Sequence, residues 1–170
     1  MQSSSRPNAR RLRDATQRLS DRDENTGSRP NSYQRAVSGL RRAPDRALLS
    51  YGQERTQFGQ PIAEFQLLQG MIADSKAESY AAECMVLDTA KRRDQGENVN
   101  TLASCCKLYA TEMVGRVADR AVQYHGGAGY IEEYAVARFY RDVRLFRIYE
   151  GTSQIQQGII ARNLLRDAKT

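Results

Sequence analysis

Tryptophan is absent from the 170 residues, histidine occurs once, and there are only three cysteines. One histidine is too few for a His-rich metal site, and no Ser or Cys stands at a recognisable triad spacing from His125. We therefore favour a hydrogen-bonded or exposed His125 over a catalytic one. The cysteines, Cys84, Cys105 and Cys106, lie in apolar helical rows without CxxC spacing. Their odd number predicts buried thiols in a reducing compartment, not a disulfide framework or a zinc site.

Long apolar runs are also missing, and the first residues lack the apolar core of a signal peptide. We therefore expect a soluble, cytoplasmic protein that does not cross a membrane. Glycine and proline become sparse after residue 70, and no alternating stretch bounded by turn residues predicts a strand. The length fits one domain, and the patterns that remain favour helices.

The net charge of +6 lies entirely in the first part of the chain. Residues 1–46 hold 11 arginines against 5 acidic residues, whereas residues 47–170 hold 15 charged residues of each sign. The Arg/Ser-rich start has too few apolar side chains to offset chain entropy. We expect residues 1–35 to be disordered and residues 36–170 to form the folded domain. Without interleaved aromatics, a solvated tail is favoured over a nucleic-acid-binding one.

Apolar residues at helical spacing predict an all-α, up-and-down helical bundle without a sheet. The first helical run, from about residue 33, is interrupted by Pro44, and Gly59 and Pro61 mark a further stop and restart. Later helices are expected over about residues 62–94 and 100–125, followed by a short helix, the connection at Glu150 and a last helix ending near 166. The expected buried stripe of the 62–94 helix comprises Phe65, Leu68, Ile72, Tyr80, Cys84 and Leu87. The apolar row of the 100–125 helix comprises Leu102, Cys106, Tyr109, Met113 and Val117, and that of the next helix comprises Val136, Phe139, Val143 and Phe146.

One polar stretch combines a carboxylate with a helix start, in the order Glu150-Gly151-Thr152-Ser153. Thr and Ser hydroxyls accept hydrogen bonds from the free N–H groups of a first helical turn. Glu150 should therefore sit on a tight connection just before a helix. From these residues alone, a glutamate stabilised by the helix dipole and a functional carboxylate are about equally supported.

Several short motifs occur along the chain in a fixed order. They are Arg55-Thr56-Gln57-Phe58-Gly59, Gln66, Gln123-Tyr124-His125-Gly126-Gly127-Ala128-Gly129-Tyr130 and Tyr149-Glu150-Gly151-Thr152-Ser153-Gln154. Each is weak alone, since a Gly-rich turn after a helix usually serves only as a C-cap, and Arg55 alone could be a solvated charge. Together they resemble the C-terminal helical domain of the acyl-CoA dehydrogenases, from about residue 48 to 166 and more loosely from 36. The resemblance implies an up-and-down four-helix bundle.

The resemblance implies an FAD site shared between subunits of a homodimer or homotetramer. Arg55 would meet the pyrophosphate, to which a guanidinium can bind in a bidentate way. Backbone N–H groups near Gly126 and Gly127 could approach the cofactor without a Cβ in the way. The remaining residues that the resemblance assigns to FAD are Gln66, Gln123, Thr152, Ser153 and Gln154.

The resemblance further implies that Glu150 removes the α-proton of an acyl-CoA thioester while the flavin accepts the β-hydride. Its apolar neighbours Ile148, Tyr149 and Ile155 are expected to shield it from water, which would make the carboxylate a stronger base. Gly151 and Arg162 match positions that border the substrate in some relatives, and electron-transfer flavoprotein is the implied electron acceptor.

Two functions remain open at this point. One is an FAD-dependent acyl-CoA dehydrogenase or its C-terminal domain. The other is a non-catalytic helical bundle, derived from that family, that oligomerises or binds partners. No counterpart of the family's N-terminal helical domain or β-domain stands ahead of the motifs in these residues, so we expect the isolated chain to lack turnover.

Overall fold

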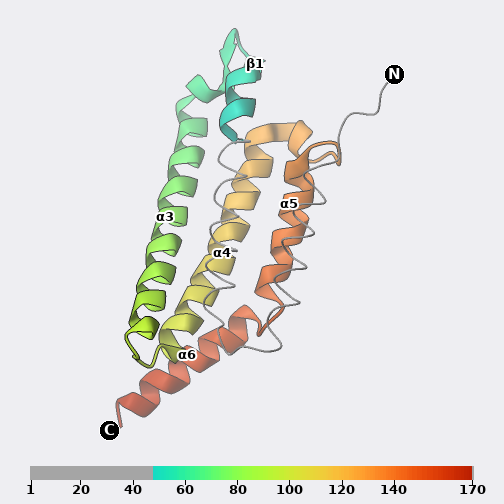
Figure 1. Ribbon diagram of the computed structural model, residues 1–170. Helices are drawn as coiled ribbons and strands as arrows, with labels where there is room; N and C mark the ends of the chain where they lie inside the picture. The colour runs from blue at the N-terminus through green and yellow to red at the C-terminus, as the bar shows by residue number, and fades with distance from the viewer. Residues whose placement is uncertain (1–47, 170) are drawn as a thin grey trace.

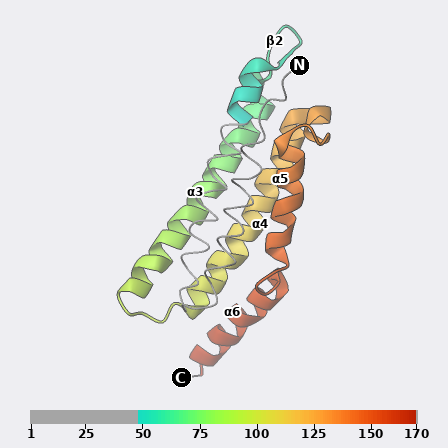
Figure 2. The same ribbon diagram turned by 45° about the vertical axis from the view of Figure 1, so that its right-hand side comes forward.

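The computed structural model describes residues 48–169, and it shows an antiparallel arrangement of helices (Figure 1). Helices α3, α4 and α5 run alongside one another, and α6 lies at the end of the bundle away from the small hairpin (Figures 1 and 2). The all-α fold expected from the sequence is confirmed. The segment 1–35 and the helices expected before residue 48 lie outside the described residues. In order, the elements are a helical segment 48–54, β1 (Thr56–Gln57), β2 (Gln60–Pro61), η1 (Ile62–Glu64), α3 (Gln66–Asp94), α4 (Asn100–His125), η2 (Gly126–Gly129), α5 (Ala135–Arg144), η3 (Leu145–Arg147) and α6 (Ser153–Asp167).

The expectation of no sheet is wrong at one place, the hairpin formed by β1 and β2. Thr56 pairs with Pro61 and Gln57 pairs with Gln60 in antiparallel register. The two residues between the strands have positive φ, 53° at Phe58 and 82° at Gly59, as a two-residue primed hairpin turn requires. Strands of two residues are too short to produce an alternating pattern, so the sequence showed only a stop and a restart.

The face of α3 that packs against α4 is lined by small residues, and the predicted stripe is wrong in its second half. Tyr80 is 62% exposed and Leu87 48% exposed, and Cys84 is exposed as well. The buried residues of α3 are Ser75, Ser79, Ala82, Val86 and Thr89. These residues are also three or four positions apart, so α3 has two faces that could pack against a neighbour. The face with the smaller side chains lets the backbones of α3 and α4 approach more closely.

Small polar groups are tolerated in this interface because their hydrogen bonds are made locally. The hydroxyls of Ser75 and Thr89 donate to the carbonyls four residues earlier, at 2.7 and 2.8 Å. Of the apolar rows predicted for the next two helices, Cys106, Met113 and Val117 of α4 and Val136 and Val143 of α5 are buried. The remaining members, Leu102, Tyr109, Phe139 and Phe146, are half-buried. Burial raises the pKa of the Cys106 thiol. The expectation of three buried thiols is thus met at Cys106 and wrong at Cys84, which is exposed, and Cys105 is half-buried.

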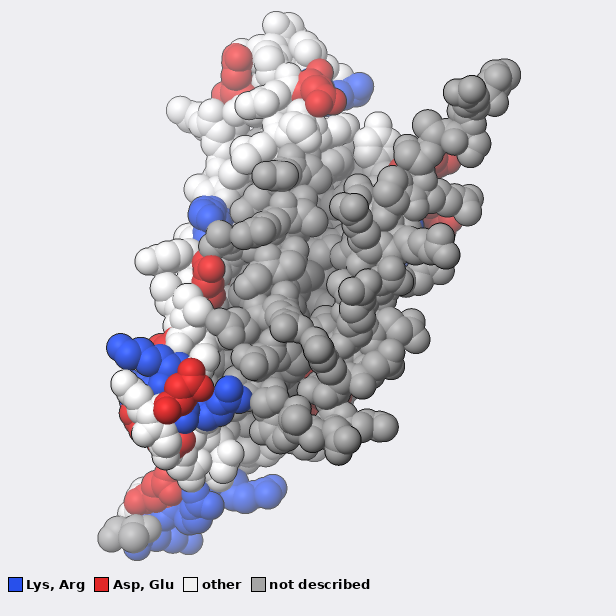
Figure 3. All heavy atoms as spheres, viewed as in Figure 1, with Lys and Arg blue, Asp and Glu red and all other residues white. Residues whose placement is uncertain are grey.

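A second group of buried residues ties the hairpin end of the bundle together. Leu48 and Ile62 pack with Ala121, Tyr124 and Val136, which brings the segment before β1, the end of α4 and the start of α5 into contact. At the opposite end, charged side chains of both signs gather near the C-terminus on the face shown in Figure 3. There Arg92 pairs with Asp88 at 2.8 Å and with Glu97 at 3.4 Å.

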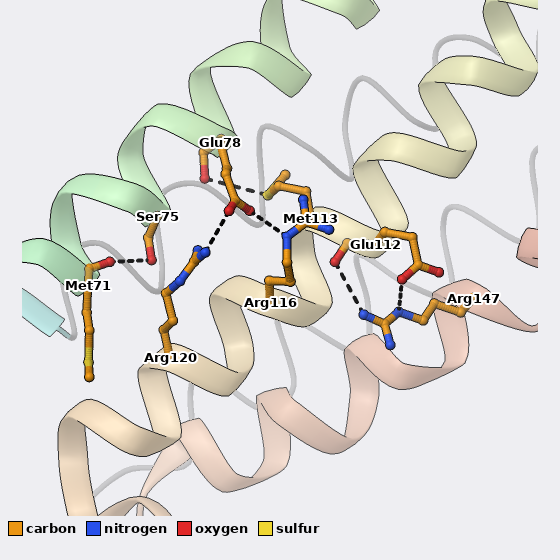
Figure 4. Close-up of polar contacts among 9 residues, drawn as sticks. Met71, Ser75, Glu78, Glu112, Met113, Arg116, Arg120 and Arg147 are labelled. Atoms are coloured by element: carbon orange, nitrogen blue, oxygen red, sulfur yellow. Dashed lines mark hydrogen bonds and ion pairs between the residues drawn. The ribbon is translucent and has the colours of Figure 1, made fainter.

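One half-buried carboxylate joins α3 to α4. Glu78 accepts from Arg116 Nε at 2.9 Å and from Arg120 Nη2 at 2.6 Å, and the three side chains converge in Figure 4. Burial alone would raise the pKa of Glu78, but the hydrogen bonds from Arg120 and Arg116 outweigh burial and lower the pKa. A carboxyl with a lowered pKa in the folded state adds stability above its unfolded pKa, and this stability is lost as the pH falls through the folded pKa.

We therefore expect Glu78→Gln to lower the free energy of unfolding at pH 7 by about 1–3 kcal/mol, because it leaves two guanidinium groups without their anion. The difference from the wild type should shrink as the pH falls below about 4. Urea unfolding at several pH values measures both effects. The control Glu97→Gln removes an exposed pair and should change stability by less than about 0.5 kcal/mol; an equal loss in both variants would contradict this account.

Candidate active site and cofactor site

The predicted site residues fall into two groups at opposite ends of the bundle. Arg55, Gln66, Gln123, Gly126 and Gly127 lie at the hairpin end, where Tyr51 stacks on His125 with ring centroids 4.1 Å apart. The Tyr51 hydroxyl also donates to the carbonyl of His125 at 3.2 Å. These contacts place the segment before β1 directly against the end of α4.

Polar groups at the hairpin end face solvent from a fixed backbone. The side chains of Arg55, Gln66 and Gln123 are exposed. The backbone of Arg55 is held on both sides, because its N–H donates to Tyr51 O and its carbonyl accepts from Ile62 N, each at 2.8 Å. An exposed guanidinium on a fixed backbone can bind an anion with little loss of backbone entropy.

The glycine turn η2 leaves an open surface beside these side chains. Gly126 has φ of 59°, and a Cβ added at Gly126 or Gly127 would meet no atom within 4 Å. Gly129 differs, because a Cβ there would lie 2.6 Å from the Val122 carbonyl oxygen. Thus Gly129 is required for packing, whereas the first two glycines expose backbone that a ligand could approach.

His125 is buried and already satisfied, as the sequence predicted. Its Nδ1 lies 2.8 Å from the carbonyl oxygen of Ala121, and its ring is covered by Tyr51. Among residues 48–169, no group of three or more His, Cys, Asp or Glu side chains is placed to hold a metal ion. No helix in that same range is both long enough and apolar enough to span a bilayer.

The second group surrounds Glu150, on the connection that the sequence predicted. Glu150 has φ of 52° and Gly151 has φ of 87°. Thr152 is the N-cap of α6, and its hydroxyl accepts from Ile155 N at 3.3 Å. The side chain of Gln156 folds back and donates to the carbonyl of Glu150 at 3.3 Å. The carboxylate is therefore presented by a left-handed turn at the start of a capped helix.

The apolar shield expected around Glu150 is not formed by its own neighbours. Ile148, Tyr149 and Ile155 are 51%, 41% and 56% exposed, and Glu150 is itself exposed. Side chains that follow one another along a turn spread outward instead of enclosing one of their number. Enclosure of this carboxylate therefore requires a surface from outside residues 48–169.

Two residues beneath this turn were missed by the sequence analysis. Lys107 is 2% exposed, and its Nζ donates to Gly151 O at 2.6 Å. Burial lowers the pKa of Lys107, and the carboxylates of Glu150 and Glu112 act in the opposite direction. Glu112 accepts from the Ser153 hydroxyl at 2.7 Å. Glu112 also pairs with Arg147 Nε at 3.1 Å (Figure 4). The available signal was a lysine next to Cys106 on the apolar face of α4.

The remaining predicted residues lie on α6 or at its start. Ser153 is buried, and because its hydroxyl donates to Glu112, its side chain is engaged within the protein. Gln154 and Arg162 are exposed.

Within one chain the two groups stay far apart. Lys107, which contacts Gly151, and Gln123 are 16 residues apart on α4, or about 24 Å at the rise of an α-helix. That distance is well beyond the reach of a side chain.

The motifs and this fold match a known family. The sequence-family model of the acyl-CoA dehydrogenase C-terminal domain matches residues 25–165 of this chain. The chain belongs to the acyl-CoA dehydrogenase family. The match begins ahead of residue 36, the boundary expected from composition, and that boundary lies outside the described residues.

The chain is also similar to individual proteins and solved structures. The caffeyl-CoA reductase-Etf complex subunit CarC of Acetobacterium woodii is 48% identical over 118 residues, which cover 69% of this chain and 31% of CarC. The structure of butyryl-CoA dehydrogenase from Megasphaera elsdenii superposes with a TM-score of 0.75 at 34% identity and covers 80% of this chain and 36% of that one. An FAD complex of PigA superposes with a TM-score of 0.70 at 28% identity, covering 79% and 34%. The chain therefore spans about a third of the length of these relatives.

Proposed function

We propose that this chain provides the C-terminal domain of an FAD-dependent acyl-CoA dehydrogenase, with Glu150 as the base that removes the α-proton of an acyl-CoA thioester. The observation that carries the proposal is the position of Glu150, which is exposed on a left-handed turn directly before the capped N-terminus of α6. The family assignment supports it, because the turn bears the motif that resembles the family's catalytic signature.

The described residues fit a flavin cofactor. At the hairpin end, an exposed guanidinium, two exposed amide side chains and an open glycine backbone are suited to phosphate and hydroxyl groups. These are Arg55, Gln66, Gln123, Gly126 and Gly127. The free N–H groups at the start of α6, near Thr152, Ser153 and Gln154, favour an anionic or polar group there. Bound FAD would supply the hydride acceptor.

The chemical work of this chain would then fall to Glu150. The carboxylate would take the proton from the α-carbon, and Gly151, the next residue along the turn, would border the substrate. The N-terminus of α6 would favour the negative charge of the carboxylate before the reaction. Arg162, exposed on α6, would border the substrate.

The separation of the two groups favours a site built from more than one copy. Since about 24 Å of helix lies between them, the hairpin end of one chain and the Glu150 end of another would hold the same cofactor. Large apolar side chains remain exposed on α6, with Ile155 at 56%, Leu164 at 59% and Leu165 at 66%. Exposed apolar faces of this kind mark association surfaces, and we propose a homodimer or homotetramer.

Electron-transfer flavoprotein is the proposed acceptor of the electrons. The support is one relative, CarC, whose name places it in a complex with Etf. Acyl-CoA is proposed as the substrate on similar support, namely the name of another relative, which is a butyryl-CoA dehydrogenase.

Purification followed by light scattering and visible absorption tests assembly and cofactor together. We expect a dimer or tetramer at micromolar concentration, and a flavin band that bleaches when acyl-CoA is added without oxygen to an assembly containing this chain. A monomer would contradict the shared site. A stable oligomer that never retains flavin would instead support the non-catalytic bundle.

A further inference from the structure

The buried ammonium group of Lys107 is not explained by the proposed chemistry. Its side chain is 2% exposed and lies on the face of α4 that also buries Cys106, Ala110 and Val114. A charge removed from water is costly unless it is paired and hydrogen-bonded. An apolar residue of similar size would fill this position at lower cost.

The groups that face Lys107 all belong to the turn before α6 or support it. Its Nζ donates to the carbonyl of Gly151 at 2.6 Å, and the carboxylates of Glu150 and Glu112 both favour its charged form. Glu112 is in turn tied to the first residue of α6 by the Ser153 hydroxyl, at 2.7 Å. The ammonium therefore connects the middle of the bundle to the backbone beneath Glu150.

That backbone adopts a conformation that needs support. Glu150 and Phe58 are the two non-glycine residues with positive φ among residues 48–169, and a side chain at Cβ makes this region unfavourable. The turn is also packed, because a Cβ added at Gly151 would lie 2.9 Å from Gln156 Nε2. A strained turn persists only when its surroundings hold it.

We propose that Lys107 is a positioning residue, which fixes the left-handed turn and thereby the direction of the Glu150 carboxylate. Its catalytic meaning rests on the proposed function of Glu150. The hydrogen bond between Lys107 and the carbonyl of Gly151 does not depend on that function.

A purely structural lysine and a positioning lysine predict different results for Lys107→Met. Methionine is similar in length and removes a buried charge, so the positioning role predicts a melting temperature that is unchanged or higher. It also predicts that residues 150–156 loosen while the core of α4 stays protected. A structural role predicts a lower melting temperature and loss of protection throughout.

The test uses the full 170-residue chain, without flavin or substrate, and compares Lys107→Met, Lys107→Arg and the exposed control Lys76→Met. Amide exchange by NMR should be faster at Gln156 by on the order of tenfold in Lys107→Met, the effect of losing one charged hydrogen bond. The carbonyl carbon signal of Gly151 should shift in the same variant. Lys107→Arg, which keeps a cationic donor, should recover part of both effects, and Lys76→Met should show neither.

Unchanged exchange at Gln156 and an unchanged Gly151 signal in folded Lys107→Met would overturn the proposal. So would a uniform loss of protection that includes Val114 and Ala118. If Lys107→Met does not fold, the same two signals in Lys107→Gln, which keeps an uncharged N–H donor, decide between the roles. Because no readout depends on FAD or turnover, failure of this proposal is distinguishable from failure of the proposed enzyme function.

Discussion

Glu150→Gln should lower the rate of flavin reduction by acyl-CoA by about 10²- to 10⁴-fold, the usual contribution of a general base. The amide has the shape of the carboxylate but cannot accept the proton, so the loss should fall on kcat, with flavin and ligand binding largely kept. Rapid mixing under anaerobic conditions, with an assembly that contains this chain and oxidises acyl-CoA, measures the rate directly.

The matched control for this variant is Glu132→Gln. It removes the same charge from an exposed position between η2 and α5, and it should leave the rate within about twofold because it touches neither group of site residues. A Glu150→Gln protein that reduces flavin at the wild-type rate would refute the assignment of the base.

Arg55→Ala should weaken FAD binding by roughly 10- to 100-fold. A charge-assisted bidentate contact with a phosphate is worth about 1.5–3 kcal/mol, and the backbone of Arg55 is already fixed by hydrogen bonds at 2.8 Å on both sides. Arg55→Lys should recover only part of the affinity, since an ammonium cannot make the bidentate contact. Titration of the apo assembly with FAD, followed by flavin fluorescence, gives the dissociation constants.

Arg138→Ala is the control for this measurement. Arg138 is exposed on α5 and belongs to neither group of site residues, so its removal changes the net charge equally. Equal weakening in the two alanine variants would show that Arg55 acts only through the overall charge.

The helices were predictable because their signals are local. The boundaries of α4, Asn100–His125, follow from apolar spacing and the glycines after it. The cap at Thr152 could likewise be predicted from its hydroxyl and position. The packing face of α3 could not be predicted, because two rows of residues on this helix both have helical spacing. One row contains the small residues Ser75, Ser79 and Ala82, and the other contains larger apolar residues. Only the neighbouring helix decides which row is buried.

The candidate site was predictable as a set of residues and not as an arrangement. The turn at Glu150 could be inferred from Gly151 and Thr152, since these residues determine local backbone geometry. The contact between Lys107 and Gly151 could not be inferred, because it spans 44 positions. The place of Lys107 on an apolar helix face was a signal of burial only, and lysine is almost always exposed. The division of the site residues between two ends of α4 depends equally on long-range packing.

The most direct test of the central claim follows the hydrogen atoms on the α-carbon of the substrate. An assembly containing this chain is incubated anaerobically with α-deuterated acyl-CoA, and the flavin reduction rate and the deuterium lost to water are measured. Proton abstraction by Glu150 predicts slower reduction of flavin by the deuterated substrate and deuterium loss in the wild type, with both reactions nearly absent in Glu150→Gln. Undiminished deuterium loss in Glu150→Gln would contradict the account, because another group would then be removing the α-proton.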